Sequence, residues 1–136
     1  MNKKIFPGVY KALAEIGEFV SSQSEKAGLN ENDVYSVQLA VDEACTNIIE
    51  HGYEGEGIGE IECTCEILPD GIMITLIDEG KLFNPKDAPI PKLQIPLDEL
   101  VSRGAGVYLM HKVMDEVTYS VSKDNKNKLK LFKKNS

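Results

Sequence analysis

The stretch Val41–Tyr53, "VDEACTNIIEHGY", carries an apolar and a polar pattern on one predicted helix. The apolar residues extend a stripe that begins upstream and consists of Val34, Val37, Val41, Ala44 and Ile48. Glu43, Asn47 and His51 recur at four-residue spacing and form a second stripe, about 100° around the helix from Ala44 and Ile48. These polar groups therefore lie at the margin of the core, where a cleft could open.

The polar stripe has two readings. In the first, Glu43 and Asn47 face solvent, and His51 interacts favourably with the dipole at the helix C-terminus. In the second, the carboxylate and the amide oxygen hold Mg²⁺ and orient an attacking group. Mg²⁺ keeps several waters and can take its remaining oxygens from nucleotide phosphates. The stretch alone leaves both readings open.

Helical periodicity extends upstream of this stretch. A first helix is predicted from apolar residues at steps of four, three and four, namely Val9, Leu13, Ile16 and Val20. Pro7 suits the opening of that helix, and Gly28 suits its C-terminal end. The second helix can be capped by Asn32 or Asp33 and is expected to end at Gly52.

The pattern then changes to period two. Residues 60–67 alternate in polarity, "PDG" at 69–71 signals a turn, and 72–78 ("IMITLID") form a more apolar strand, so an antiparallel hairpin is predicted. A long segment broken by prolines follows. Residues 107–117 resume a helical pattern, and "VTYSV" and "KLKLF" are predicted to pair as a closing hairpin.

This order of elements predicts an α+β fold. We expect a two-layer sandwich, with a four-stranded, mostly antiparallel sheet and about three helices on one face. "MNKKIF" at the N-terminus is barely long enough for a strand and is not counted in the sheet. The 136 residues suit a single domain, 1–136, because a chain of this length can bury a sizeable core.

Composition excludes several classes. A net charge of −7 disfavours non-specific binding to nucleic acid. No apolar run approaches the roughly 18 residues of a membrane span, and no secretory signal is evident, so a cytoplasmic location is expected. Cys45, Cys63 and Cys65 are an odd number of thiols and are interpreted as small core residues rather than disulfide or metal ligands.

Two further stretches could carry chemistry. In "ITLIDEG" an apolar strand ends in Asp78 and Gly80, which is either an ordinary turn or a carboxylate placed to accept an exocyclic amine, with room for a flat ring. In "RGAGVYLM" two glycines precede a helix, which is either a hinge or an anion site built from exposed backbone N–H groups.

Taken in chain order, these stretches resemble the motifs of the GHKL or Bergerat-fold ATPases, and among them the small bacterial anti-sigma factor serine kinases. "DEACTNIIEHGY" resembles their N box, "DEGKLFNP" their Asp-x-Gly box and "RGAGVYLMHKVMDEV" their glycine box. The resemblance spans residues 34–132. The chain departs from the family pattern in its last hairpin, "KDNKNKLKLF", which lacks the usual glycine pair.

The resemblance implies a role for each matching position. Glu43 would be the general base, Asn47 would bind Mg²⁺, and Asp78 would accept the adenine amine. The remaining implied ATP-binding groups are Gly80, which gives the ring room, the phosphate-binding Gly104 and Gly106, Arg103 beside them, and an ATP lid at about residues 84–103.

The implied function is an ATP- and Mg²⁺-dependent serine-protein kinase that also binds a sigma factor. Its substrate would be a serine of a small anti-anti-sigma protein of the STAS type, with no direct contact to nucleic acid or membrane. The main alternative is a non-catalytic module that binds ATP or ADP and switches partners. A histidine-kinase catalytic domain ranks lower, because no acceptor histidine precedes His51. The sequence leaves open whether the chain forms a homodimer.

Overall fold

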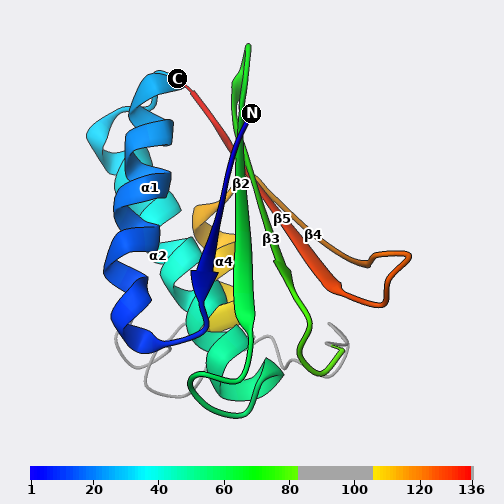
Figure 1. Ribbon diagram of the computed structural model, residues 1–136. Helices are drawn as coiled ribbons and strands as arrows, with labels where there is room; N and C mark the ends of the chain where they lie inside the picture. Colours follow the sequence, from blue (N-terminus) through cyan, green and yellow to red (C-terminus); the bar gives the residue numbers. More distant parts are fainter. Residues whose placement is uncertain (83–105, 136) are drawn as a thin grey trace.

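The chain folds into two layers, a sheet and a set of helices that cover one of its faces (Figure 1). The computed structural model describes residues 1–82 and 106–135. Its sheet has the order β1-β2-β3-β5-β4, and every neighbouring pair is antiparallel. The strands are β1 (Asn2–Pro7), β2 (Glu60–Leu68), β3 (Gly71–Asp78), β4 (Glu116–Val121) and β5 (Asn127–Lys134). The helices are α1 (Leu13–Lys26), α2 (Glu31–Asn47) and α4 (Gly106–Val113). The predicted α+β sandwich is confirmed.

The sheet has five strands, so the expectation of four was wrong. β1 is the additional strand, and it pairs with β2 from Asn2 opposite Cys65 to Pro7 opposite Glu60. Its one buried side chain, Phe6, packs against Phe19 of α1 with ring centroids 6.1 Å apart. A strand this short is stabilised by its ladder and by this packing more than by its own sequence, which explains why local pattern did not reveal it.

The beginning of the first helix also differs from expectation. Pro7 ends β1 instead of opening the helix, and a short 3₁₀ turn over Tyr10–Ala12 leads into α1 at Leu13. The C-terminal end was predicted correctly. Gly28 follows α1 with a φ of 88°, a left-handed conformation that glycine adopts without steric cost.

Helix α2 begins one residue after its cap, Asn30. The Asn30 side chain accepts a hydrogen bond from the N–H of Asp33 at 2.8 Å, so the cap is Asn30 and neither Asn32 nor Asp33. The α-helix ends at Asn47 and continues as a π-helical turn, Ile48–Gly52. The extra residue in that turn makes Ile49, rather than Ile48, the fully buried side chain.

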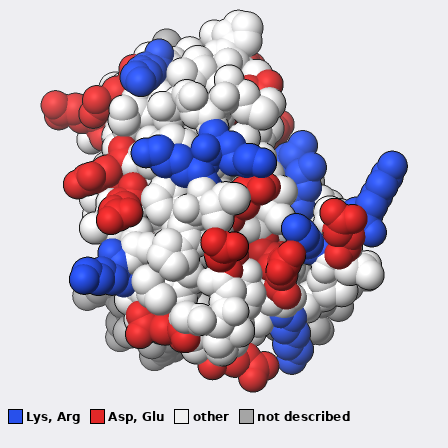
Figure 2. Space-filling model, viewed as in Figure 1, with Lys and Arg blue, Asp and Glu red and all other residues white. Residues whose placement is uncertain are grey.

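The three cysteines lie in the core between sheet and helices, at most 1% exposed, which confirms their interpretation as buried residues. On the side of the molecule seen in Figure 2, acidic and basic side chains are interspersed among uncharged ones. One ion pair there joins Lys3 of β1 to Glu62 of β2 at 3.4 Å. Among the described residues, no helix combines the length and hydrophobicity needed to cross a membrane.

Candidate functional site

A buried carboxylate stands at the end of the central strand β3. Alternate residues of β3 point inward, and the series Ile72, Ile74 and Leu76 continues to Asp78, which is 5% exposed. Strand periodicity therefore places an acid where the preceding positions hold aliphatic side chains. A buried charge of this kind requires hydrogen-bonded support.

That support comes from two donors within the fold. The N–H of Gly80 donates to Asp78 Oδ1 at 2.9 Å, and the side-chain amide of Asn127 donates to the same oxygen at 3.0 Å. Burial raises the pKa of Asp78 above its ordinary value of 3.8, while these two hydrogen bonds act in the opposite direction. Both of these donors bind Oδ1, and among the described residues none is placed on Oδ2.

Gly80 is packed against the end of the π-helical turn. A Cβ built on Gly80 would lie 2.7 Å from the carbonyl oxygen of Gly52, which is closer than real Cβ atoms approach. The N–H of Lys81 donates to that same oxygen at 2.8 Å. That Gly80 leaves room for a flat ring stays a prediction, and the structure shows that its missing side chain permits close contact between two backbone segments.

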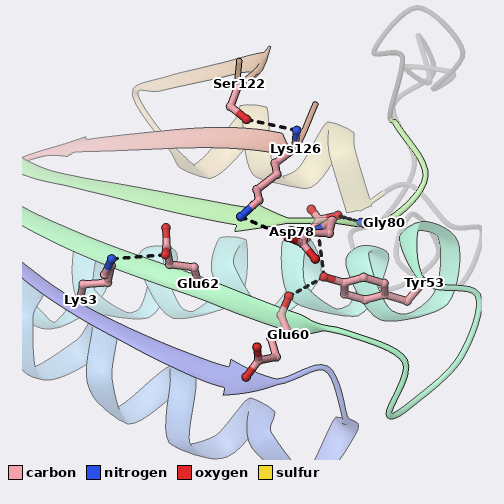
Figure 3. A network of polar contacts seen from close by, with 9 residues as sticks. Lys3, Tyr53, Glu60, Glu62, Asp78, Gly80, Ser122 and Lys126 are labelled. Atoms are coloured by element: carbon pink, nitrogen blue, oxygen red, sulfur yellow. Dashed lines mark hydrogen bonds and ion pairs between the residues drawn. The ribbon is translucent and has the colours of Figure 1, made fainter. Parts of the chain in front are cut away.

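Tyr53 is hydrogen-bonded to the backbone corner that directly follows β3 (Figure 3). Its hydroxyl donates to the carbonyl oxygen of Glu60 at 2.5 Å and accepts the N–H of Glu79 at 2.9 Å. The ring is 8% exposed, and a Cβ on Gly59 would lie 2.3 Å from it. Tyr53 thus ties the loop after α2 to the first residue beyond β3.

Glu43 and Asn47 lie one turn apart on α2, and both are half-buried, as their position at the core margin predicted. Burial, and then the neighbouring carboxylates of Asp42 and Glu50, raise the pKa of Glu43 above 4.5. Glu43 is thereby made a better proton acceptor. The Asn47 amide makes no hydrogen bond to another described residue, so it can bind a ligand.

The remaining predicted site residues lie near or beyond the limit of the described chain. Gly106 is the first residue of α4, and α4 packs against α2. Arg103, Gly104 and the expected lid at 84–103 fall outside the described residues. His51 is exposed at the end of the π-helical turn.

The structure brings Asp78 and Gly80 together with Gly52, and it adds two residues that sequence reasoning missed. Asn127 directly precedes the predicted closing strand "KLKLF", and Tyr53 is the last residue of the N-box stretch, but neither was predicted to belong to the site. Register supplied the only available signal for Asn127, because a closing hairpin paired with β3 would set Asn127 opposite Asp78. A polar residue opposite a buried acid is a candidate partner.

These residues fit a nucleotide and Mg²⁺. Asp78 could offer one oxygen to an amine beside the bare backbone of Gly80, and Asn47 could offer its amide oxygen one turn from the Glu43 carboxylate. Oxygen donors of this type suit Mg²⁺ that is shared with phosphates.

Comparison with known proteins agrees with this geometry. The family model of the histidine kinase-like ATPase domain matches residues 6–133. The chain belongs to this family. Among solved structures, the RsbU and RsbW domains of Rv1364c from Mycobacterium tuberculosis superpose with a TM-score of 0.66 at 14% identity, covering 98% of this chain and 32% of that one. A histidine kinase domain from Erythrobacter litoralis EL346 gives 0.56 at 13% identity, covering 94% and 61%. Both show the fold.

Within the histidine kinase-like ATPase family, the chain is similar to bacterial serine-protein kinases named RsbW. The Bacillus licheniformis protein is 31% identical over 107 residues, which cover 75% of this chain and 66% of that protein. The Bacillus subtilis protein is 29% identical over 102 residues, or 72% and 64%. The match to each thus covers slightly less than two thirds of that relative's length.

Proposed function

We propose that this chain is an ATP-dependent serine-protein kinase of the anti-sigma type, acting in the cytoplasm as a single domain, 1–136. The observation that carries the proposal is the half-buried Glu43 with its raised pKa, one turn before Asn47, in a domain whose fold binds nucleotide. A half-buried carboxylate with a raised pKa is suited to act as a general base. Similarity to the serine-protein kinases RsbW supports the same reading.

In the proposed reaction, the γ-phosphoryl group passes from ATP to a serine hydroxyl. The serine oxygen forms the new P–O bond, the bond to the β-phosphate oxygen breaks, and ADP leaves. Glu43 accepts the serine proton. Asp78 accepts a hydrogen bond from the adenine amine and so holds the nucleotide. Asn47 would hold Mg²⁺, which neutralises phosphate charge when bound. In phosphoryl transfer the rate enhancement comes mainly from positioning the reactants and neutralising charge, and the protein forms no covalent bond to the phosphoryl group.

The remaining parts of the proposal concern phosphates and partners. Gly104 and Gly106 would present backbone N–H groups to the phosphates beside Arg103, under a lid at 84–103. The acceptor would be a STAS-type anti-anti-sigma protein, and a sigma factor would be the second partner. The similarity to relatives named serine-protein kinase RsbW supports a serine as the acceptor.

The test is phosphoserine formation on a STAS-type partner incubated with this protein and Mg-ATP, followed by mass spectrometry. Glu43→Gln should bind ATP normally and lose transfer by about 10²–10⁴-fold, the usual contribution of a general base. Glu31→Gln is the matched control, since Glu31 is an exposed glutamate on the same helix and is not among the charges that raise the Glu43 pKa. Equal transfer by wild type and Glu43→Gln would remove the catalytic role. ATP binding without any transfer would favour the non-catalytic partner-switching module.

A further inference from the structure

Lys133, near the C-terminal end of β5, lies at a point where three elements meet. Its Nζ donates to the carbonyl oxygen of Val113, the last residue of α4, at 2.8 Å. The same atom is 3.9 Å from Asp115 Oδ2, in the connection from α4 to β4, and 3.9 Å from Asp33 Oδ1, in the first turn of α2. The lysine side chain is 16% exposed. One ammonium group therefore joins β5, α2 and α4.

The position of this ammonium group suits the end of a helix. The last four carbonyl groups of an α-helix have no partner within the helix, and they form the negative end of its dipole. Val113 carries one of these carbonyl groups, so Lys133 supplies both a hydrogen-bond donor and a positive charge where they stabilise α4. A hydrogen bond from a charged donor is also stronger than one between neutral groups.

The backbone that follows α4 is bound to β5 as well. The N–H of Asp115 donates to the carbonyl oxygen of Phe132 at 2.9 Å, and the Asp115 carboxylate accepts the N–H of Lys134 at 2.8 Å. Together with the Lys133 contact, these bonds hold the C-terminal end of α4 against the strand. An α-helix is held by its internal hydrogen bonds and rises about 1.5 Å per residue, so fixing one end of α4 also sets the place of its other end.

The opposite ends of α2 and α4 carry groups of the proposed site. The two helices pack side by side and run in opposite directions (Figure 1), so the first turn of α2 lies beside the last turn of α4. Gly106 begins α4 at the end where phosphates are proposed to bind, and Asn47 ends α2. The axial position of α4 along α2 therefore sets how the first turn of α4 lies relative to Asn47 and Glu43.

We propose that Lys133 is a positioning residue for the phosphates of the nucleotide. It holds α4 at one axial position along α2, so that the N-terminal end of α4 and Asn47, the proposed Mg²⁺ ligand, act on the same phosphates. Lys133 makes no contact with the nucleotide, because it binds the far end of α4, about 12 Å along the helix. The inference rests on the proposed nucleotide binding and adds a residue that sets the geometry of its phosphate end.

The test compares how much the phosphates contribute to binding in Lys133→Met and in wild type. Methionine keeps an unbranched apolar side chain but removes the charge and the three donors of lysine. Calorimetry with Mg-ATP and with adenosine gives two dissociation constants, and their ratio measures the contribution of the phosphates. We expect Lys133→Met to reduce this ratio about tenfold, a usual size for coupling between sites, and to leave adenosine affinity unchanged. Loss of stability alone cannot produce this result, because it weakens the binding of both ligands by the same factor.

Lys130→Met is the matched control. Lys130 lies on the same strand, where it pairs with Thr75 of β3, and it alternates with the core residue Leu131, so its side chain points away from the helices. This variant loses the same positive charge and should keep the wild-type ratio. An equal ratio in Lys133→Met and wild type would overturn the positioning role and leave the proposed nucleotide binding intact. An equal reduction in both variants would assign the effect to net charge and would overturn it too. A wild type that binds neither ligand would overturn both proposals.

A second measurement does not require the variant to fold. Hydrogen-bonded protons with little exposure to solvent exchange slowly, whereas those of exposed side chains exchange fast. In ¹⁵N-labelled wild type without nucleotide, the ammonium protons of Lys133 should therefore exchange more slowly with water than those of the exposed Lys11. If the two exchange equally fast, the contact with Val113 is absent and the proposal fails.

Discussion

The backbone of Gly80 lies against the backbone of Gly52, within a distance that leaves no space for a side chain. A Cβ on Gly80 would be 2.6 Å from the Gly52 carbonyl carbon, and the N–H of Lys81 donates to the Gly52 oxygen at 2.8 Å. The end of the α2 segment and the corner after β3 therefore form one unit. Because α2 carries Glu43 and Asn47 while the corner carries Asp78, this contact fixes the proposed catalytic end relative to the base-binding end.

Gly80→Ala should disturb that contact. The added methyl group meets backbone atoms, which cannot rotate away, so we expect a loss of about 1–3 kcal/mol of unfolding free energy together with weaker ATP binding. Urea unfolding and calorimetry measure the two effects. Gly17→Ala is the control, because the nearest heavy atom to its Cβ is 3.9 Å away on a flexible glutamine. That change lies within α1 and should stabilise the protein by about 0.5–1 kcal/mol. A Gly80→Ala protein of wild-type stability would contradict the close approach.

Tyr53→Phe should loosen the corner by removing one oxygen. The N–H of Glu79 and the carbonyl of Glu60 would both lose their partner at a site that is largely buried. We expect a cost of about 1–3 kcal/mol in unfolding free energy and a reduced ATP affinity. Tyr35→Phe, at a side chain 64% exposed on α2, should change neither quantity. Indistinguishable denaturation curves for Tyr53→Phe and wild type would argue against the bridge.

Asp78→Asn should separate stability from binding. The folded-state pKa of Asp78 is raised, so the folded protein holds more protons than the unfolded chain between 3.8 and the raised value, and stability falls as pH rises through that window. At neutral pH the ionised carboxylate is therefore a cost that the amide removes.

An asparagine at position 78 can still accept from Gly80 and Asn127 through its oxygen, but it then turns an NH₂ group towards the base. We expect unfolding free energy at pH 7 equal to or above that of wild type, with ATP affinity lowered about tenfold or more. Thermal denaturation and calorimetry on the same samples provide the comparison. Retained ATP affinity would exclude Asp78 as the base acceptor.

Asn47→Ala should remove the magnesium-dependent part of ATP binding. The Asn47 amide makes no hydrogen bond to another described residue, so its loss should leave the fold intact and delete one oxygen ligand. Calorimetric titrations with Mg²⁺ and with a chelator should therefore give nearly equal affinities in the variant and different ones in wild type. If Mg²⁺ strengthens ATP binding to the variant as much as to the wild type, Asn47 is not a magnesium ligand.

The proposed phosphoryl transfer should depend on the ionisation of Glu43. Burial and the neighbouring acids raise its pKa above 4.5, and only the ionised form can accept the serine proton. At saturating Mg-ATP, the rate should fall as pH decreases through this raised pKa and level off above it. Glu50→Gln removes one of the two neighbouring charges, so the midpoint of the profile should move to lower pH. An unchanged midpoint would assign the profile to another group.

Local sequence determined most of the fold. The stripe from Val34 to Ala44 and the alternation in Ile61, Cys63 and Cys65 each specify one buried face, and the structure buries both. β1 could not be read in the same way. Only one of its side chains, Phe6, is buried, and a strand stabilised by its neighbour carries little periodicity of its own. The π-helical turn that buries Ile49 was hidden for a similar reason, since it breaks the helical period on which the prediction relied.

The candidate site likewise contains residues that local sequence predicts and residues that only tertiary packing reveals. Glu43, Asn47, Asp78 and Gly80 could be predicted from sequence because each belongs to a short motif with its own spacing. Asn127 and Tyr53 could not, since their partners, Asp78 and Glu79, lie far away in the chain and meet them only through strand register and loop packing. The sequence by itself determined which chemical groups this protein carries on which elements. Only the tertiary structure decided which of them are hydrogen-bonded and held in place, because hydrogen bonds between distant residues depend on how the strands and helices pack.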